Sequence, residues 1–195
     1  MSFSPPDVLR LYESAMRQSG HVFWLFGLSG AGKSTVAAGL GKAMQSRGQG
    51  TLALDGDVVR AGLNKDLGFS DRDRSENLRR AAEIARLGRD SGLCVIASFI
   101  TPLEQHRILI REIVGADGMS LIYLNATVEV CISRDRKGLY AEAHAGKIRD
   151  MTGVSSPFEA PGFFDLMLNT NAETEMESCE RLVEFSRTRI QPWKI

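Results

Sequence analysis

The stretch that decides the fold covers residues 22–34 and reads Val22-Phe23-Trp24-Leu25-Phe26-Gly27-Leu28-Ser29-Gly30-Ala31-Gly32-Lys33-Ser34. Its first five residues form an unbroken apolar run, which is typical of a strand buried on both faces of a parallel sheet. After Ser34, apolar residues recur at helical spacing at Val36, Leu40 and Met44. The order of strand, glycine-rich loop and helix predicts a phosphate-binding P-loop.

The chemistry of such a loop follows from its residue types. Glycines let backbone N–H groups point at phosphate oxygens, at the positive end of a helix dipole. We expect Lys33 to bridge the terminal phosphates of ATP and the Ser34 hydroxyl to ligate Mg²⁺. The residues predicted to hold the donor nucleotide are Gly27, Leu28, Ser29, Gly30, Ala31, Gly32, Lys33 and Ser34.

Further apolar runs predict the rest of the sheet, and helical patterns separate most of them. This alternation indicates an α/β fold of three layers, with a five-stranded, mainly parallel sheet and ligands at the carboxyl ends of the strands. The predicted strands cover residues 22–26, 51–54, 93–99, 120–124 and 166–168. The predicted helices begin after Ser34 and cover residues 75–90, 103–114, 127–135 and 174–189.

The length of 195 residues indicates one domain, so we expect residues 1–195 to share a single sheet. Residues 1–18 are predicted to form a helical arm that packs on the core or on a partner. Residues 137–161 combine Gly, Pro, Ser and charged residues with few strand signals, which predicts a mobile lid.

The amino-acid composition limits the kinds of molecule that the protein is expected to bind. Lys and Arg number 24, as do Asp and Glu, so no overall positive field favours nucleic acid or an anionic membrane. Small substrates are therefore expected. The sequence has no apolar run of the roughly 20 residues that cross a bilayer, and we expect a cytoplasmic protein. Its cysteines, Cys94, Cys131 and Cys179, are too far apart in sequence for a CxxC pair, which argues against a zinc site or a disulfide framework.

Two carboxylates follow the second predicted strand, in the sequence Asp55-Gly56-Asp57. At the carboxyl end of a strand beside the P-loop they could orient Mg²⁺-bound water and accept a proton from an attacking hydroxyl. The alternative is a turn with a helix N-cap. We assign Asp55 the structural part and Asp57 the role of base, because Asp57 lies further along the loop. The third predicted strand ends without an acidic residue, and residues 124–127 lack the Asn-Lys-x-Asp pattern that reads guanine, which favours a small-molecule kinase over an ATPase or a GTPase.

Basic and aromatic side chains cluster between the second and third predicted strands. An acceptor with a phosphate or sulfate group would need guanidinium groups such as those of Arg60 and Arg74, and Phe69 could stack on a base. Acidic residues such as Asp73 and Glu76 are interleaved with the arginines, so a solvated, ion-paired helix face is the alternative.

The predicted lid adds Arg134 and Lys137, which could close over the transferring phosphate or could be surface charge. The histidines, His21, His106 and His144, have no spacing typical of a metal site, so we expect each to be structural or incidental.

Jointly, these motifs resemble those of the adenylylsulfate kinase family, which uses ATP to phosphorylate the 3′-hydroxyl of adenosine 5′-phosphosulfate (APS). The resemblance covers about residues 21–170. Its carriers are the loop through Thr35, Leu54-Asp55-Gly56-Asp57, Arg60, residues 62–70, Arg74, Glu76-Asn77, Ser98-Phe99-Ile100, Lys137-Gly138-Leu139-Tyr140 and Glu159-Ala160-Pro161.

The resemblance implies roles for the matching residues and, for the whole protein, a homodimer. Asp57 would orient or deprotonate the ribose hydroxyl, Lys33 would act on the phosphates, and Phe69 and Phe158 would sandwich the adenine. Thr35 and Arg134 would join the loop in binding ATP, and Ser34 and Asp57 would hold Mg²⁺. The acceptor would contact Asp57, Arg60, Phe69, Arg74, Asn77, Ile100, Thr101, Lys137, Leu139 and Phe158.

The departures from the family pattern lie on the acceptor side and in the lid. Thr101 stands where the family usually has a serine, so we assign Thr101 a binding role only. Ser155-Ser156 replaces an acidic pair.

Two alternative functions stay open. One is a related kinase for another nucleotide, such as cytidine diphosphoramidate. The other is a non-catalytic nucleotide-binding module, against which the intact Lys33, Ser34 and Asp57 argue.

Overall fold

A computed structural model describes residues 20–135 and 137–190 of the chain. The predicted N-terminal arm, residues 1–18, lies outside the described residues.

The centre of the molecule is a parallel sheet. Within the described residues its order is β2-β3-β1-β4-β5, and all four pairings are parallel. The predicted α/β fold and its five strands are confirmed, with each end within two residues of its expected place. The strands are β1 (His21–Phe26), β2 (Thr51–Asp55), β3 (Cys94–Ser98), β4 (Met119–Asn125) and β5 (Leu166–Asn169).

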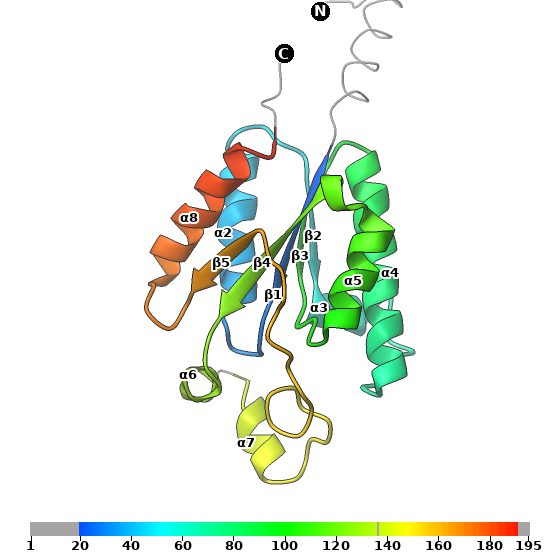
Figure 1. Ribbon diagram of the computed structural model, residues 1–195, viewed down its shortest axis with the longest axis vertical. Coiled ribbons are helices and arrows are strands. Elements are labelled where there is room, and N and C mark those ends of the chain that lie inside the picture. The colour runs from blue at the N-terminus through cyan, green and yellow to red at the C-terminus, as the bar shows by residue number, and fades with distance from the viewer. Residues whose placement is uncertain (1–19, 136, 191–195) are drawn as a thin grey trace, which may run out of the picture.

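Helices cover both faces of the sheet, as expected (Figure 1). On one face lie α2 (Lys33–Gln45) and α8 (Glu175–Arg187), and on the other lie α4 (Asp71–Asp90) and α5 (Glu104–Val114). Side chains of β1 alternate between the two cores: Phe23 and Leu25 join the cluster under α2 and α8, and Trp24 joins the one under α4 and α5. This double burial explains the unbroken apolar run of β1.

Short elements gather at the carboxyl edge of the sheet, where the parallel strands all end (Figure 1). They are α3 (Gly56–Ala61), α6 (Val128–Ser133) and α7 (Leu139–His144), while η1 (Ala116–Gly118) precedes β4. The pattern over residues 127–135 predicted α6, but no pattern predicted α3, η1 or α7, whose three to six residues hardly show a helical period. The edge that carries these elements and the P-loop is where the fold places a ligand.

The start of α4 differs from the expected one. The helix begins at Asp71 and not at residue 75, because the Ser70 hydroxyl accepts a hydrogen bond from the Asp73 N–H at 3.2 Å and caps the earlier turn.

The predicted lid contains more structure than its composition suggests. Its helix α7 buries Tyr140, whose hydroxyl donates to the Ser29 carbonyl of the P-loop at 3.0 Å. Met151 and Thr152 are also buried. Residues 137–161 thus pack against the loop that they are predicted to cover. Their mobility stays a prediction.

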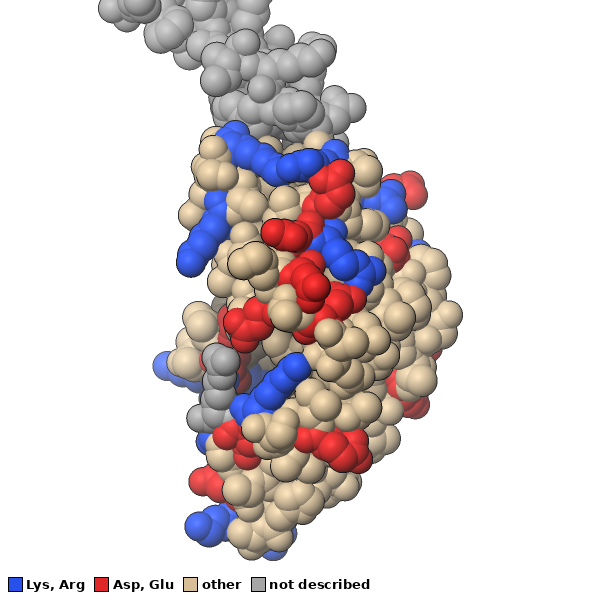
Figure 2. Space-filling view, turned by 90° about the vertical axis from the view of Figure 1, so that its left-hand side faces the viewer, with Lys and Arg blue, Asp and Glu red and all other residues tan. Residues whose placement is uncertain are grey.

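The distribution of charged side chains on the surface agrees with the equal numbers of basic and acidic residues in the sequence. On the face shown in Figure 2, basic and acidic side chains lie side by side and neither sign covers it. Among the described helices, none has both the length and the apolar content that a membrane crossing requires.

Candidate active site

The P-loop fills the turn between β1 and α2, which confirms the predicted strand, loop and helix. Gly27 has φ 148°, and a Cβ atom there would lie 2.5 Å from the Leu124 carbonyl oxygen. Gly32 caps α2 with φ 94°. Both positions need glycine, the first for space and the second for its left-handed backbone. These glycines therefore let the loop turn tightly between β1 and α2, the turn in which a P-loop binds phosphate.

Lys33 lies folded over this loop. Its Nζ donates to the carbonyl oxygens of Gly27 at 3.0 Å and Leu28 at 2.7 Å. Burial lowers the pKa of Lys33 to about 8, although nearby acidic groups, among them Asp55 and Asp57, oppose the shift. An anion bound in the loop would supply the missing charge partner.

Asp55 joins the second strand to the P-loop. One of its carboxylate oxygens accepts from the Ser34 hydroxyl at 2.7 Å and from the Ser98 hydroxyl at 2.9 Å. The other accepts from the Asp57 N–H at 3.0 Å and so caps α3. Burial opposes ionisation of Asp55, but these hydrogen bonds outweigh it and hold its pKa below the usual value.

The N-cap role expected for Asp55 is confirmed, but sequence reasoning missed its contact with Ser34. The contact depends on the register of the sheet, which places Asp55 opposite Ser98 of the strand next to β1. A hydroxyl and a carboxylate beside a phosphate loop are the hard oxygen ligands that Mg²⁺ takes together with phosphates and water. These residues therefore fit the ion.

Asp57 lies in the first turn of α3 and is largely exposed. Its carboxylate forms an ion pair with Lys137 Nζ from the predicted lid. The hydrogen bond with Asp57 raises the pKa of Lys137. Two residues predicted to act at the acceptor are thus in contact, although they lie far apart in the sequence. Ligation of Mg²⁺ by Asp57 stays a prediction, since the carboxylate that contacts Ser34 is that of Asp55.

Arg60, Phe69 and Arg74 come together as expected. The guanidinium carbons of Arg60 and Arg74 lie 4.5 Å and 5.8 Å from the centroid of the Phe69 ring. Arg60 also donates to the Gly68 carbonyl at 2.8 Å, and Arg74 donates to the Phe69 carbonyl at 2.9 Å. Burial and the charge of Arg74 lower the pKa of Arg60. Two cations around one exposed ring can hold an aromatic ligand that carries an anionic group.

Arg74 has a second set of partners in the predicted lid. It donates to the Thr152 hydroxyl at 3.2 Å and to the Asp150 carbonyl. Together with the pair of Asp57 and Lys137, these contacts tie the lid to the acceptor side.

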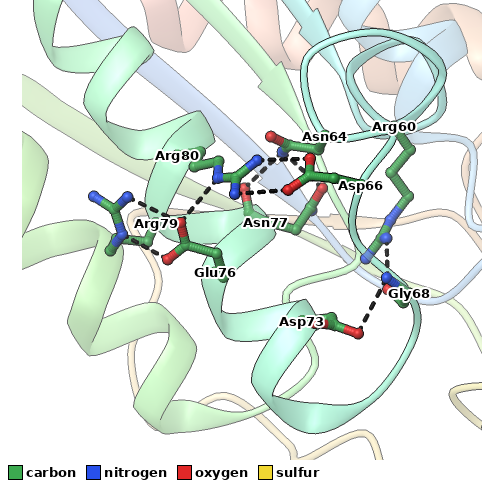
Figure 3. Close-up of polar contacts among 9 residues, drawn as sticks. All are labelled: Arg60, Asn64, Asp66, Gly68, Asp73, Glu76, Asn77, Arg79 and Arg80. Carbon is green, nitrogen blue, oxygen red and sulfur yellow. Dashed lines mark hydrogen bonds and ion pairs between the residues drawn. The ribbon is translucent and has the colours of Figure 1, made fainter.

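A polar network beneath this cluster holds the segment of residues 62–70 against α4 (Figure 3). Asn77 is buried, and its side-chain oxygen accepts from Asn64 Nδ2 at 2.9 Å. Arg80 donates to Asp66 and Glu76, each at 2.8 Å. Arg80 therefore lies on an ion-paired face of α4. Asn77 supports the segment that carries Phe69, and its contact with the acceptor stays a prediction.

The other predicted acceptor residues lie on the loop after β3 and in the lid. Ile100 accepts from the Gly27 N–H through its carbonyl at 3.2 Å. Thr101 is buried, and its hydroxyl accepts from the Trp24 indole at 2.9 Å, which gives this side chain a partner inside the core. Leu139 packs on the core under α2. The Phe158 ring stacks on that of Tyr123 with centroids 6.2 Å apart.

Phe158 also lines a groove of about 590 Å³ between the P-loop and the lid. Leu28, Tyr123 and Val128 form other parts of its wall.

The remaining predicted donor residues are Arg134 and Thr35. Beyond the end of β4, Arg134 donates to the Thr170 carbonyl at 2.5 Å. Thr35 is partly buried in the first turn of α2. The predicted donor residues therefore lie near the ends of β1 and β4.

Two of the three histidines have the structural role expected of them. His21 contacts the Ser120 hydroxyl at 2.9 Å, and His106 contacts the Ser75 hydroxyl at 3.0 Å. Both are buried.

Comparison with known proteins supplies the family. Residues 19–169 match the family model described as Adenylylsulphate kinase. The adenylyl-sulfate kinase of Paraburkholderia xenovorans is 49% identical over 164 residues, which cover 84% of this chain and 91% of that protein. The solved structure of the Mycobacterium tuberculosis APS kinase in complex with AMPPNP and APS is similar, with a TM-score of 0.82 and 39% identity over 86% of this chain and 98% of that one.

A hexameric APS kinase from Thiobacillus denitrificans is also similar, with a TM-score of 0.67 and 25% identity. That match covers 98% of this chain and 35% of the other. The match to the family model spans most of the sequence and includes the P-loop, the Asp55 to Asp57 turn and the Phe69 cluster. The chain belongs to the adenylylsulfate kinase family.

Proposed function

We propose that this protein transfers the γ-phosphoryl group of ATP to the 3′-hydroxyl of APS, which yields 3′-phosphoadenosine 5′-phosphosulfate for sulfate assimilation. The observation that carries the proposal is the contact of the Phe69 ring with the guanidinium groups of Arg60 and Arg74, at the sheet edge that also bears the P-loop. A ring flanked by two guanidinium groups suits an adenine nucleotide with further anionic groups. The related mycobacterial structure, which holds APS and an ATP analogue, supports the same pairing of substrates.

The donor half of the mechanism belongs to the loop. Its backbone N–H groups and Lys33 hold the phosphates, and Arg134 and Thr35 assist. Ser34 and Asp55 would hold Mg²⁺, with Asp57 as the further ligand predicted from the sequence, and the bound ion would neutralise charge on the transferring phosphoryl group. Because Lys33 already lies against the loop, phosphate binding only has to exchange two carbonyl oxygens for phosphate oxygens.

The acceptor half centres on Asp57, which takes the proton of the attacking ribose hydroxyl. Lys137 now pairs with that carboxylate, so the hydroxyl has to displace or share this contact. Once released, Lys137 can turn to the phosphoryl group. Phe69 and Phe158 hold the base, while Arg60, Arg74 and Asn77 hold the rest of the acceptor, with Ile100, Thr101 and Leu139 around it.

The same proposal covers the organisation of the protein. Residues 1–195 act as one domain, with residues 137–161 as a lid that moves during turnover and excludes water. We further propose that it is a cytoplasmic homodimer whose ligands are small nucleotides.

Turnover with a panel of acceptors tests the function. Purified protein with ATP and Mg²⁺ is expected to release ADP when APS is added, with one new phosphate on the product by mass spectrometry. Faster turnover with cytidine diphosphoramidate would replace APS by that acceptor. ATP binding in calorimetry without ADP release for any acceptor would mean a non-catalytic module.

A further inference from the structure

Arg107 is a charged side chain enclosed in the protein that the proposed mechanism does not use. It lies in the first turns of α5, and only 1% of its surface is exposed. Its Nε donates to Glu104 Oε2 at 2.8 Å. Its guanidinium carbon lies 5.5 Å from the centroid of the Phe26 ring. Because an unsatisfied charge is costly to bury, the partners of this group show what it holds together.

Three backbone carbonyl oxygens from two separate loops accept its other hydrogen bonds. Nη1 donates to Thr101 at 3.1 Å and to Pro102 at 3.3 Å, both on the loop after β3. Nη2 donates to Glu159 at 3.1 Å, at the end of the predicted lid. A planar guanidinium group can span these oxygens at once, whereas an ammonium group is a point charge. Arg107 therefore joins the lid to the loop after β3.

Further contacts strengthen the same junction. The Glu159 N–H donates to the Pro102 carbonyl at 2.9 Å, and the Glu159 carboxylate accepts from the Glu104 N–H at 2.6 Å. The arrangement also continues through aromatic rings. Phe26 stacks on Tyr123 with centroids 5.3 Å apart, and Tyr123 stacks on Phe158.

Both loops that Arg107 joins carry predicted acceptor residues next to the atoms that it holds. Phe158 immediately precedes Glu159, and Ile100 and Thr101 precede Pro102. Thr101 has φ 46°, a left-handed backbone that a β-branched residue adopts at a cost, so it needs partners to keep it there. The hydrogen bonds from Trp24 and Arg107 supply them.

We propose that Arg107 is a positioning residue for the nucleotide acceptor. It sets the place of the Phe158 ring relative to the backbone of residues 100–101, and so determines how tightly the acceptor base is held. Arg107 touches neither substrate and acts through Phe158. This inference rests on the proposed function in one respect, which is that Phe158 stacks on an acceptor base.

The substitution Arg107→Lys tests the proposal, because it keeps the positive charge but removes the planar guanidinium group that spans the three carbonyl oxygens. We expect the KM for APS to rise about tenfold, while kcat and the KM for ATP stay within about twofold, since stacking on one base is worth a change of that order. Arg111→Lys is the matched control. Arg111 lies one turn further along α5 over the Phe163 ring, and its replacement should leave both KM values unchanged.

A double variant separates positioning from a general loss of structure. If Arg107 acts through Phe158, Arg107→Lys combined with Phe158→Ala should have the same KM for APS as Phe158→Ala alone. Additive increases, or equal increases in the KM values for ATP and APS, would overturn the proposal.

If Arg107→Lys does not fold, Glu104→Ala provides the second test. The Glu104 side chain is 42% exposed, and its loss removes the ion-pair partner of Arg107 Nε, while three backbone carbonyl oxygens still accept from the buried guanidinium group. A rise in the KM for APS alone is expected, and an unchanged KM would contradict the proposal. A wild-type protein inactive towards APS would instead refute the proposed function. In that case the calorimetric affinity for APS, expected to be about tenfold weaker in Arg107→Lys, tests the inference.

Discussion

Two carboxylates that stand two positions apart have different surroundings. The carboxylate of Asp55 accepts hydrogen bonds from the Ser34 hydroxyl, the Ser98 hydroxyl and the Asp57 N–H. Together these bonds use both of its oxygens. Asp57 is exposed at the sheet edge and pairs with Lys137. A base must reach the proton of its substrate, so this division supports the proposed role of Asp57 in proton transfer and the proposed role of Asp55 in supporting the loop and Mg²⁺.

The first prediction concerns this division. Asp57→Asn should lower kcat about a hundredfold or more, because general-base catalysis is worth a factor of that order. The affinity for ATP in calorimetry should change little. Asp55→Asn is the comparison variant and should weaken binding of ATP with Mg²⁺. An unchanged kcat in Asp57→Asn would remove Asp57 from the mechanism.

The second prediction follows from the pKa of Lys33, which burial lowers to about 8. Only the protonated ammonium group attracts phosphate. ATP affinity should therefore fall as the pH rises through about 8, the pKa of Lys33 in the ligand-free protein. The limiting slope is about tenfold per pH unit. Calorimetry from pH 7 to pH 9.5 measures it. Lys33→Arg stays charged over this range and should bind ATP with little pH dependence. Parallel curves for the two proteins would contradict the assignment.

The residues of the site differ in how far sequence could predict them. Lys33, Ser34 and the loop glycines belong to one local pattern, whose meaning does not depend on the rest of the fold. The contact of Asp55 with Ser34 depends on the pairing of β2 with β3, which no local pattern contains. Arg107 was not predicted for a related reason. Its sequence position on α5 indicates a helix surface, and only the approach of the lid makes that surface an interior.

At the scale of elements, the predicted lid and α3 carry residues on two sides of the proposed acceptor region. The capped helix α3 carries Asp57 and Arg60, and the segment of residues 62–70 is fixed to α4 by Asn64 and Arg80 (Figure 3). The lid contributes Lys137 and Phe158 and touches the opposite side through Arg74. One side is therefore held by its own network, and the other by contacts with the P-loop, Arg74 and Arg107.

The third prediction concerns the ring that the lid contributes. Phe158→Ala should raise the KM for APS about tenfold, since base stacking on an aromatic ring is worth about 1 to 3 kcal/mol. The KM for ATP should stay the same. Phe158→Tyr keeps the ring and serves as the control with near-normal kinetics. Equal KM values for APS in wild type and Phe158→Ala would mean that this ring does not contact the base.

Long helices were predictable from sequence, whereas among the short helices only α6, within the predicted range 127–135, was expected. Every strand carries an apolar run, and α2, α4, α5 and α8 are long enough to show a helical period. In contrast, α7 has six residues in a segment of mixed composition, and its anchor is the single buried ring of Tyr140. Whether such a segment is a coil or a helix is decided by tertiary packing.

For the whole molecule, β1 is the central strand, and His21 at its start links it to β4 through Ser120. Burial lowers the pKa of His21 to about 4, and the charges of Arg189 and Arg89 add to this effect. The unfolded chain therefore binds a proton near pH 6.5 that the folded protein takes up only near pH 4.

The fourth prediction is the resulting acid sensitivity. Below pH 6.5 the unfolded state binds more protons than the folded state, so the free energy of unfolding falls as the pH decreases towards 4. His21 should account for up to about 3 kcal/mol of this loss. Urea unfolding at pH 7, 5.5 and 4.5 measures it, with His21→Gln as the comparison. Equal pH dependence in the two proteins would show that His21 is not responsible.

The strand order has a consequence for how such proteins diversify. The P-loop follows the central strand, and most residues proposed to bind the acceptor follow β2 and β3 on one flank. Arg134 follows β4 on the other flank, together with Lys137, Leu139 and Phe158 of the predicted lid. The proposed acceptor contacts outside the lid are thus encoded apart from the proposed ATP contacts. Mutation and selection could change the accepted nucleotide at these positions while the P-loop stays unchanged.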